Sequence, residues 1–265
     1  ISRTGFPSFL RAYSFNPSLL LGFATTSPHS FSEVFSYMKK YFIDEAKTFA
    51  INTPVDARVE LMGWEEIPIV YIDNFYKNPN MVRNLAIKLP PTSDPRILGG
   101  VTGSRVASFF DFQHIYPVWV EIAQGVFGLK KEEEDKFEAS MFSTPFSVNV
   151  TQSKDRPDLP HIDLPDITSR GWAGLIYLNK GDECKGGTGF YTYKGHQVNP
   201  KQDGLWDKDY VCDSIGPWEL MHLAEMKFNR MIMYPATVMH TPYDKPGFFE
   251  GDDYRLVQVF FLPVI

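Results

Sequence analysis

The stretch of this sequence best suited to chemistry is a histidine and an aspartate two residues apart, His161 and Asp163. On an extended strand, side chains at this spacing lie on the same face, so an imidazole and a carboxylate stand side by side. These donors suit a divalent transition metal. Two ligands do not hold a catalytic metal, and we predict that His240, 79 residues further on, is the third. His240 ends the segment 234–240, which we expect to be a short strand.

One other histidine competes for the third ligand position. His222 lies within residues 217–226, for which we predict a helix, and a helix there would interrupt the order of strands. We therefore prefer His240. The other histidines considered have no partner at a useful spacing and are interpreted as surface or core residues: His29, His114 and His196.

The elements that must position these ligands change in character along the chain. Helical periodicity and start signals predict helices over residues 33–50, 79–89 and 116–127. The charged run 130–136 is interpreted as a solvated turn. The Gly- and Ser-rich stretch 92–110 is interpreted as a loop that covers another part of the protein.

Strands are predicted mainly in the second half of the chain. One precedes it, over residues 67–73, and from about residue 138 short β-rich segments are separated by turn residues. Their ranges are 139–151, 172–178, 188–193, 228–234, 237–240 and 254–262. Many short strands indicate a sandwich or barrel. We expect one domain over 1–265, in which 1–137 is an N-terminal extension with supporting helices and 138–265 is the catalytic core.

Composition narrows the class of protein. The 265 residues carry a formal net charge of −6, which gives no reason to expect a nucleic-acid partner. No run of 18 apolar residues occurs, so we expect no membrane span. Two cysteines make no disulfide framework and favour a reducing compartment, so a soluble, cytoplasmic protein is expected. The stretch 1–32 has arginines and no acidic residue, which leaves organellar targeting open.

Four further segments accompany the metal pair in a fixed order. They are the entry 67–79, Gly174–Asn179, Gly186–Tyr191 and the last strand, Arg255–Phe261. With His161, Asp163 and His240, these segments resemble the 2-oxoglutarate/Fe(II) dioxygenases, most strongly the prolyl-hydroxylase-like branch. The resemblance implies an α+β fold with a mainly β core. That core would be a double-stranded β-helix, a jelly roll similar to cupins, with N-terminal supporting helices.

The resemblance also assigns cofactors and site residues. His161, Asp163 and His240 would hold Fe(II), with 2-oxoglutarate as co-substrate and O₂ as oxidant. Arg255 offers a planar fork that can meet the far carboxylate of 2-oxoglutarate bidentately. The residues implied to assist it in holding the co-substrate are Tyr177, Thr151 and Asn149.

The reaction implied is oxidation of an unactivated C–H bond, with release of succinate and CO₂. Hydroxylation is the default outcome, and desaturation or oxidative cyclisation shares its first step. Because Asp163 is retained, where halogenating relatives have Gly or Ala, halogenation is disfavoured. The chain departs from many relatives at Val257, where they carry a hydroxyl residue.

For the substrate we expect a small, carboxylate-bearing or amino-acid-like molecule. Arg170 stands where a related arginine meets substrate, and Arg156 adds positive charge at the same rim. Two alternatives remain open: a protein or peptide hydroxylase of the prolyl type, and a non-catalytic cupin-like metal-binding protein. The sequence does not indicate the substrate's identity or the oligomeric state.

Overall fold

The structure is a computed structural model that describes residues 43–92, 104–108, 110, 115–143, 146–152, 160–200, 203–205 and 211–264. By its internal contacts the chain divides into two units, residues 1–43 and 44–265. All elements below belong to the second unit. Most of the helix predicted over 33–50 lies outside the described residues, and within them that range contributes only α3 (Glu45–Thr48).

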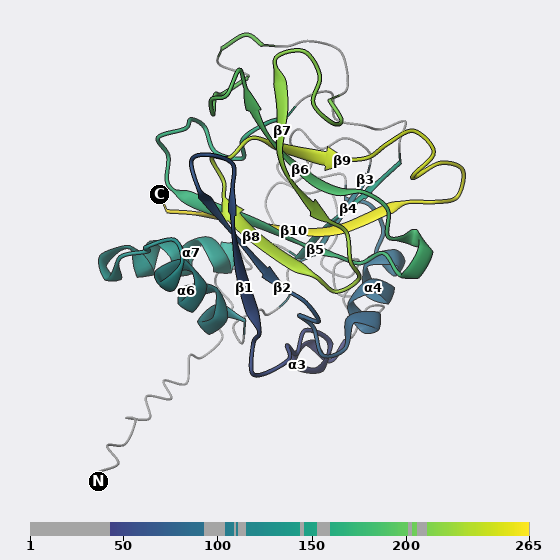
Figure 1. Cartoon of the computed structure of the whole chain (residues 1–265). Helices are drawn as coiled ribbons and strands as arrows, with labels where there is room; N and C mark the ends of the chain where they lie inside the picture. The colour runs from purple at the N-terminus through teal and green to yellow at the C-terminus, as the bar shows by residue number, and fades with distance from the viewer. Residues whose placement is uncertain are drawn as a thin grey trace, which may run out of the picture. The chain divides into compact units, whose positions relative to one another are not determined.

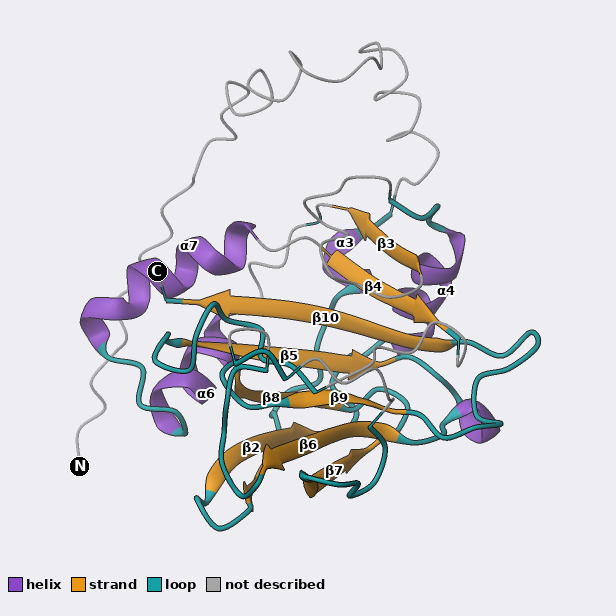
Figure 2. Cartoon of the chain, turned by 90° about the horizontal axis from the view of Figure 1, so that it is seen from above, coloured by secondary structure: helices purple, strands orange, loops and turns teal. Residues whose placement is uncertain are grey.

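The described residues form two antiparallel sheets, shown in Figures 1 and 2. The large sheet has the strand order β1-β2-β8-β5-β10-β4-β3, and the small sheet the order β7-β6-β9. The strands are β1 (Ala57–Met62), β2 (Ile67–Ile72), β3 (Ser104–Ser108), β4 (Phe146–Thr151), β5 (Gly171–Tyr177), β6 (Gly187–Tyr193), β7 (Trp218–Glu225), β8 (Met231–Pro235), β9 (His240–Tyr243) and β10 (Arg255–Pro263). Three strands of the large sheet thus come from before residue 138.

The main core lies between the two sheets, and strand parity decides which side chains enter it. Along β10, Val257 packs in this core with Tyr177 of β5 and Phe190 of β6. Arg255 is two residues from Val257 and therefore points to the same side. The polar end of the core thus receives a buried arginine, 4% exposed.

Helices cover the opposite face of the large sheet. Trp119 of α6 (Tyr116–Gly125) stacks on Phe260 of β10, with ring centroids 4.3 Å apart. Phe137 of α7 (Glu134–Ser143) meets Trp172 of β5 edge-on at 5.5 Å. Toward the other end of the sheet lies α4 (Pro79–Lys88), which begins with the proline that the first helical turn tolerates. The described residues also contain two 3₁₀ turns, η1 (Lys131–Glu133) and η3 (Gly181–Glu183).

The sequence predictions for this architecture hold in outline. A mainly β core with few helices is confirmed, as are the helices near 79–89 and 116–127. The strands near 67–73, 172–178, 188–193 and 254–262 are also present. Closure of the two sheets as a jelly roll stays a prediction. No helix in the described part of the chain is long and apolar enough to cross a membrane.

Two predictions of local structure were wrong. Residues 130–136 do not form a turn but contain η1 and the start of α7, whose acidic first turn suits the positive end of the helix dipole. The predicted helix at 217–226 is β7, which pairs with β6 along its whole length. Leu, Met, Ala and Glu favour helices locally, but pairing with a neighbouring strand overrides that preference.

Three boundaries also differ from prediction. The stretch 92–110, predicted to be a loop, contains the edge strand β3. The strand predicted over 139–151 is helical up to Ser143, and β4 begins at Phe146. The strand predicted over 237–240 begins only at His240, because residues 236–239 make the turn between β8 and β9.

Candidate metal centre and anion site

The three predicted metal ligands are brought together by backbone hydrogen bonds. His161 and His240 form an isolated antiparallel bridge, with N···O distances of 3.0 and 2.9 Å in the two directions. The amide of Asp163 donates to the carbonyl of Ala236 at 2.9 Å. The segment 161–163 therefore lies along the free edge of β9, and its parity turns both side chains toward His240.

The side chains of this triad are at metal-binding distance from one another. One donor atom from each of His161, Asp163 and His240 lies within 4.8 Å of the others. Asp163 Oδ2 is 3.3 Å from His240 Nε2, and Asp163 Oδ1 is 3.7 Å from His161 Nε2. The His161 side chain is half exposed, whereas those of Asp163 and His240 are about nine-tenths buried. The group is thus buried on one side and open to solvent at His161.

The hydrogen bond made by His240 determines which nitrogen faces the carboxylate. Its Nδ1 lies 2.9 Å from the carbonyl oxygen of Val238, so we assign the proton to Nδ1. Nε2 then presents a lone pair to Asp163. Burial lowers the pKa of His240 to about 4, against the raising effect of the hydrogen bond to Val238 and with a further lowering by Arg255. The ring is therefore neutral at pH 7.

One oxygen of the Asp163 carboxylate has no hydrogen-bond donor among the described residues. Burial raises its pKa to about 6, against the lowering effects of His161 and Arg105, so it is ionised at neutral pH. Its Oδ2 accepts no hydrogen bond from any residue that the structure describes. A lone pair and an anionic oxygen thus face each other without a proton between them. A divalent cation bound between these two atoms would remove their repulsion. Two imidazoles with one carboxylate are the donor set of non-haem iron sites.

A second polar group lies where the two sheets meet near Arg255. The Arg255 guanidinium donates to the carbonyl of Gly187 at 3.2 Å and contacts Thr188 Oγ1 at 3.5 Å. The Tyr177 hydroxyl lies 2.9 Å from the same Thr188 oxygen and 3.0 Å from the carbonyl of Ala224. Burial raises the pKa of Tyr177 to about 12, so it stays a hydrogen-bond donor. The structure therefore brings the predicted pair Arg255 and Tyr177 together through Thr188.

The two other residues predicted to hold the co-substrate, Thr151 and Asn149, lie in the same region. Thr151 is the partner of Arg255 across β4 and β10, and Asn149 is the partner of Val257, so both face the space between the sheets. Asn149 Oδ1 accepts a 2.7 Å hydrogen bond from Arg105 Nε of β3. Arg105 is buried, and its charge lowers the pKa of Asp163. A second cation thus faces the triad from the edge of the large sheet.

Arg170, predicted to bind substrate, makes different contacts. Its Nε lies 3.0 Å from a carboxylate oxygen of Glu133 in η1, and it donates to the carbonyl of Gly128 at 2.5 Å. It also lies over the ring of Trp172. These contacts join β5 to the segment before α7, and they give no support to a substrate role. Arg156 lies outside the described residues, and its role stays a prediction.

The contacts of Arg170 predict a structural effect. Replacing Arg170 by Ala should lower the free energy of unfolding by about 1 kcal/mol, since the ion pair is partly exposed and the stem packs on Trp172. Urea denaturation would measure this loss. Binding of Fe(II) and 2-oxoglutarate should not change. A variant that folds as stably as the parent protein but loses substrate-dependent turnover would instead establish the substrate role.

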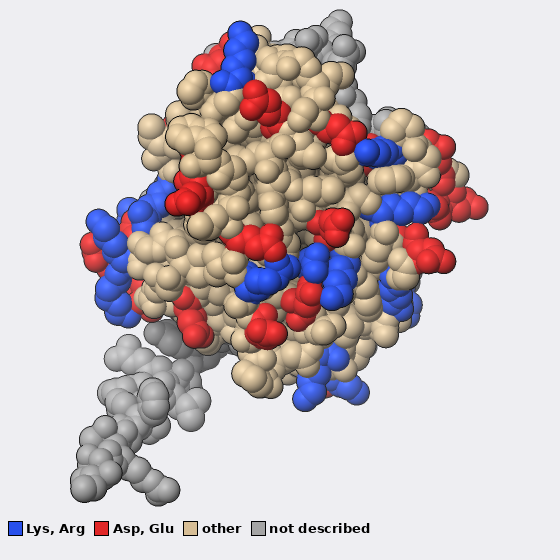
Figure 3. All heavy atoms as spheres, viewed as in Figure 1, with Lys and Arg blue, Asp and Glu red and all other residues tan. Residues whose placement is uncertain are grey.

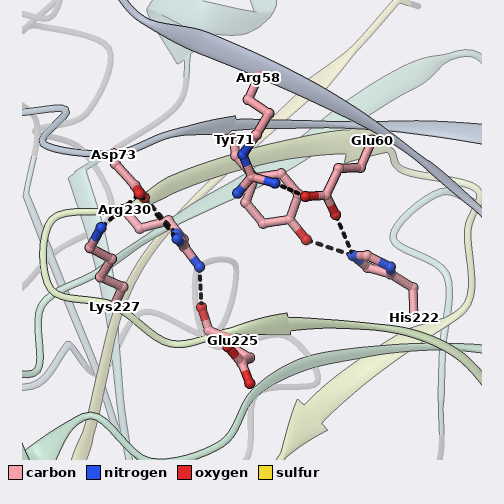
Figure 4. Close-up of polar contacts among 8 residues, drawn as sticks. All are labelled: Arg58, Glu60, Tyr71, Asp73, His222, Glu225, Lys227 and Arg230. Atoms are coloured by element: carbon pink, nitrogen blue, oxygen red, sulfur yellow. Dashed lines mark hydrogen bonds and ion pairs between the residues drawn. The ribbon is translucent and has the colours of Figure 1, made fainter.

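His222, the alternative candidate for the third ligand, makes contacts away from His161 and Asp163. It lies on β7, not on a helix, and its Nε2 is 2.6 Å from the Tyr71 hydroxyl and 3.6 Å from Glu60. Figure 4 shows these groups beside a second set, in which Arg230 and Lys227 bind Asp73. The network ties β1 and β2 of the large sheet to β7 of the small one. The structure therefore favours His240 over His222.

Three inward-facing residues were not singled out from the sequence: Thr188, Arg105 and Tyr234. For Thr188 and Tyr234, the alternation of inward and outward side chains along a strand could have indicated their position. Thr188 is two residues before Phe190, and Tyr234 two after Ile232, on strands whose inner faces are apolar. Arg105 could be found only once residues 104–108 were known to be a strand.

Surface charge gives no competing site on the face seen in Figure 3. There, Lys and Arg side chains are interspersed with Asp and Glu. Ion pairs also form elsewhere among the described residues, as between Lys185 and Asp253 at 3.0 Å. The fold and site thus define a two-sheet, mainly β protein with a candidate two-histidine, one-carboxylate metal centre beside a buried arginine.

Comparison with known proteins places the chain in a family. It belongs to the family of unknown function DUF6445, whose profile matches residues 53–203 and so includes His161 and Asp163. No curated protein matches the chain in sequence.

Three solved structures show a weaker similarity. A Pseudomonas putida prolyl-4-hydroxylase is 13% identical, with a TM-score of 0.38 over 73% of this chain and 91% of the other. A 2OG-Fe(II) oxygenase family oxidoreductase from Burkholderia pseudomallei is 10% identical, with a TM-score of 0.37 over 74% and 84%. EvdO2 from Micromonospora carbonacea var. aurantiaca is 12% identical, with a TM-score of 0.37 over 76% and 89%. Likenesses of this size do not establish a common fold or function.

Proposed function

We propose that this protein is an Fe(II)- and 2-oxoglutarate-dependent oxygenase with a jelly-roll core. The observation that carries the proposal is the coexistence of two complementary sites on facing sheets. One is a donor set of two imidazoles and a carboxylate whose Oδ2 has no hydrogen-bond donor among the described residues. The other is a buried Arg255, beside Tyr177 and Thr188.

Each site has a distinct task. His161, Asp163 and His240 would hold iron, and the half-exposed side of His161 leaves an approach from solvent. Bound iron would supply the oxidising chemistry, in which O₂ and 2-oxoglutarate give succinate, CO₂ and an oxidised C–H bond. Arg255 would pair with the far carboxylate of 2-oxoglutarate. Tyr177 and Thr188 would hold that carboxylate in position relative to the guanidinium.

The substrate class follows from the cations nearby. We propose a small molecule that bears a carboxylate, because the buried Arg105 faces the triad region while Asn149 orients it. Hydroxylation is the default outcome. Fe(II) is proposed as the resident metal from the donor set, which other divalent ions also accept.

Anaerobic titration tests this function. Adding Fe(II) and then 2-oxoglutarate should produce a visible charge-transfer absorption band, and admission of air should release succinate. His161→Ala should abolish the band. His196→Ala, an exposed histidine on the same chain, is the matched control and should keep it. Binding of metal without a band or succinate would instead support a non-catalytic metal-binding protein.

A further inference from the structure

The two edges of the large sheet differ in what pairs with them. At one end, the outer side of β3 is bonded by the segment that precedes it. Pro91 forms a bridge with Val106, and the amide of Thr92 donates to the carbonyl of Arg105 at 2.8 Å. At the other end, β1 pairs with β2 on one side, and no residue that the structure describes pairs with its outer side. The outer side of β1 is therefore an edge to which a further strand could be added.

β1 also lacks most of the features that protect an edge strand from pairing. Its six residues, Ala57–Met62, are in unbroken register with β2 and include no proline, lysine or bulge. Two apolar side chains, Val59 and Leu61, are 46% and 57% exposed. They alternate with Arg58 and Glu60 and so lie on the other face of the strand. One face of this edge is thus apolar and the other is charged.

The charged face carries one positive and one negative side chain. Figure 4 shows Arg58 and Glu60 on the same side of β1, where Arg58 lies over the ring of Tyr71 and Glu60 is 3.6 Å from His222. Within the chain the two side chains also pair with each other, and both are partly exposed. Opposite charges two residues apart on one strand can complement a second copy of the same strand that runs antiparallel to it.

The charges also select the register of such a pairing. A two-fold axis perpendicular to the sheet keeps equivalent faces together and passes beside one residue of the strand. An axis beside Arg58 would place two arginines opposite each other, and an axis beside Glu60 two glutamates, and like charges directly opposite are destabilising. An axis beside Val59 instead places each Arg58 opposite a Glu60. On the apolar face, it places Val59 opposite its own copy and each Leu61 opposite Ala57.

We propose that β1 is a dimerisation edge, at which a second copy of this chain pairs antiparallel about an axis beside Val59. The two large sheets would then form one continuous sheet. Such a contact uses the same surface on both copies, so it closes as a dimer and does not extend into a filament. None of the proposed metal or co-substrate ligands lies on β1. The inference is therefore independent of the proposed function.

Exchange of the two charges tests the pairing. In sedimentation equilibrium without metal, the parent protein should be a dimer. Arg58→Glu and Glu60→Arg each turn both cross-strand pairs into like-charge pairs, and each should weaken dimerisation about tenfold. An equal mixture of the two variants should recover the parental affinity, because two acidic residues then face two basic ones. Each substitution changes the net charge of −6 by two, so both chains stay negative and general attraction does not explain the recovery.

Cross-linking tests the register. Val59→Cys should form a covalent dimer under mild oxidation, because residues opposite each other at the axis have Cα atoms about 5 Å apart, within reach of a disulfide. Leu61→Cys is the matched control on the same exposed face. Its copy would lie about 13 Å away along the strand, so it should not cross-link. The parent protein, with its free Cys184 and Cys212, gives the background.

Unchanged circular dichroism spectra would show that the variants fold. A monomeric parent protein at all concentrations would overturn the proposal. So would a dimer that both charge variants leave intact, or a mixture of them that stays as weakly associated as each alone. Equal cross-linking through Val59→Cys and Leu61→Cys would overturn the register and with it the assigned axis.

Discussion

Replacing Asp163 by Asn should abolish metal binding and, in the metal-free protein, raise stability. The first effect follows because the triad loses its only carboxylate. We expect Fe(II) affinity to fall more than about a hundredfold, which exceeds the usual cost of disturbing a residue behind a metal ligand. The second effect follows because the ionised side chain is buried and its Oδ2 has no donor among the described residues.

The size of the stability gain follows from the pKa of Asp163. A folded-state pKa of about 6, against 3.8 for an ordinary aspartate, favours the neutral carboxyl by about 3 kcal/mol. Since the folded pKa is raised, the cost is absent below pH 4 and complete above pH 6. An asparagine removes it, and its amide can donate to the lone pair of His240 Nε2.

Urea denaturation at pH 8 with a chelator measures this gain. At that pH His240, whose pKa burial lowers to about 4, is neutral in both the folded and unfolded states and does not contribute. Adding Fe(II) should stabilise the parent protein and leave Asp163→Asn unchanged. The matched control is Asp166→Asn, a partly exposed aspartate in the same loop whose hydrogen bonds are to the nearby Thr168 and Ser169. If metal-free Asp163→Asn proved less stable than the parent, the carboxylate would have a structural partner and the metal interpretation would lose its main support.

Replacing Arg255 by Leu should weaken 2-oxoglutarate binding by about a hundredfold while Fe(II) remains bound. Arg255 is the buried cation beside Tyr177 and Thr188, and a bidentate guanidinium–carboxylate pair is among the strongest polar contacts in proteins. Arg255→Lys keeps the charge but loses the planar fork, so an intermediate loss of about tenfold is expected. Calorimetric titration under anaerobic conditions measures both.

A shorter co-substrate identifies the group that Arg255 binds. 2-Oxobutyrate has the metal-binding end of 2-oxoglutarate but no far carboxylate. It should bind the parent protein and Arg255→Leu equally weakly, because the coupling requires both partners. If the variant lost affinity for both acids to the same extent, Arg255 would act by shaping the pocket and not by pairing with the carboxylate. Retention of parental affinity for 2-oxoglutarate would remove Arg255 from the site altogether.

Much of this site could be predicted because its signals are local. The spacing of His161 and Asp163 sets their common face, and the apolar alternation of 255–262 sets that of Arg255. Both rest on the two-residue period of a strand, which any short segment carries in its own sequence. The strand that holds Arg255 was predicted close to its observed position for the same reason, whereas His161 and Asp163 lie outside the named strands and His161 pairs with β9 through one isolated bridge.

The rest depended on which segments pair, and that is a property of the whole fold. A helix-favouring segment became β7 because it pairs with β6, and this placed His222 against Tyr71 instead of beside His161 and Asp163. Arg170 fell beside Glu133 because α6 and α7 pack on the large sheet.

The sequence by itself therefore predicted the kind of site: a histidine–aspartate pair for a metal, a third ligand from strand order, and an arginine for an anion on the last strand. Tertiary structure alone decided which further residues face that site. Arg105 enters from an edge strand within a predicted loop, Thr188 joins Arg255 to Tyr177, and the ring of Tyr234 packs edge-on against His240. Contacts between distant segments depend on sheet register and burial, which no local pattern encodes.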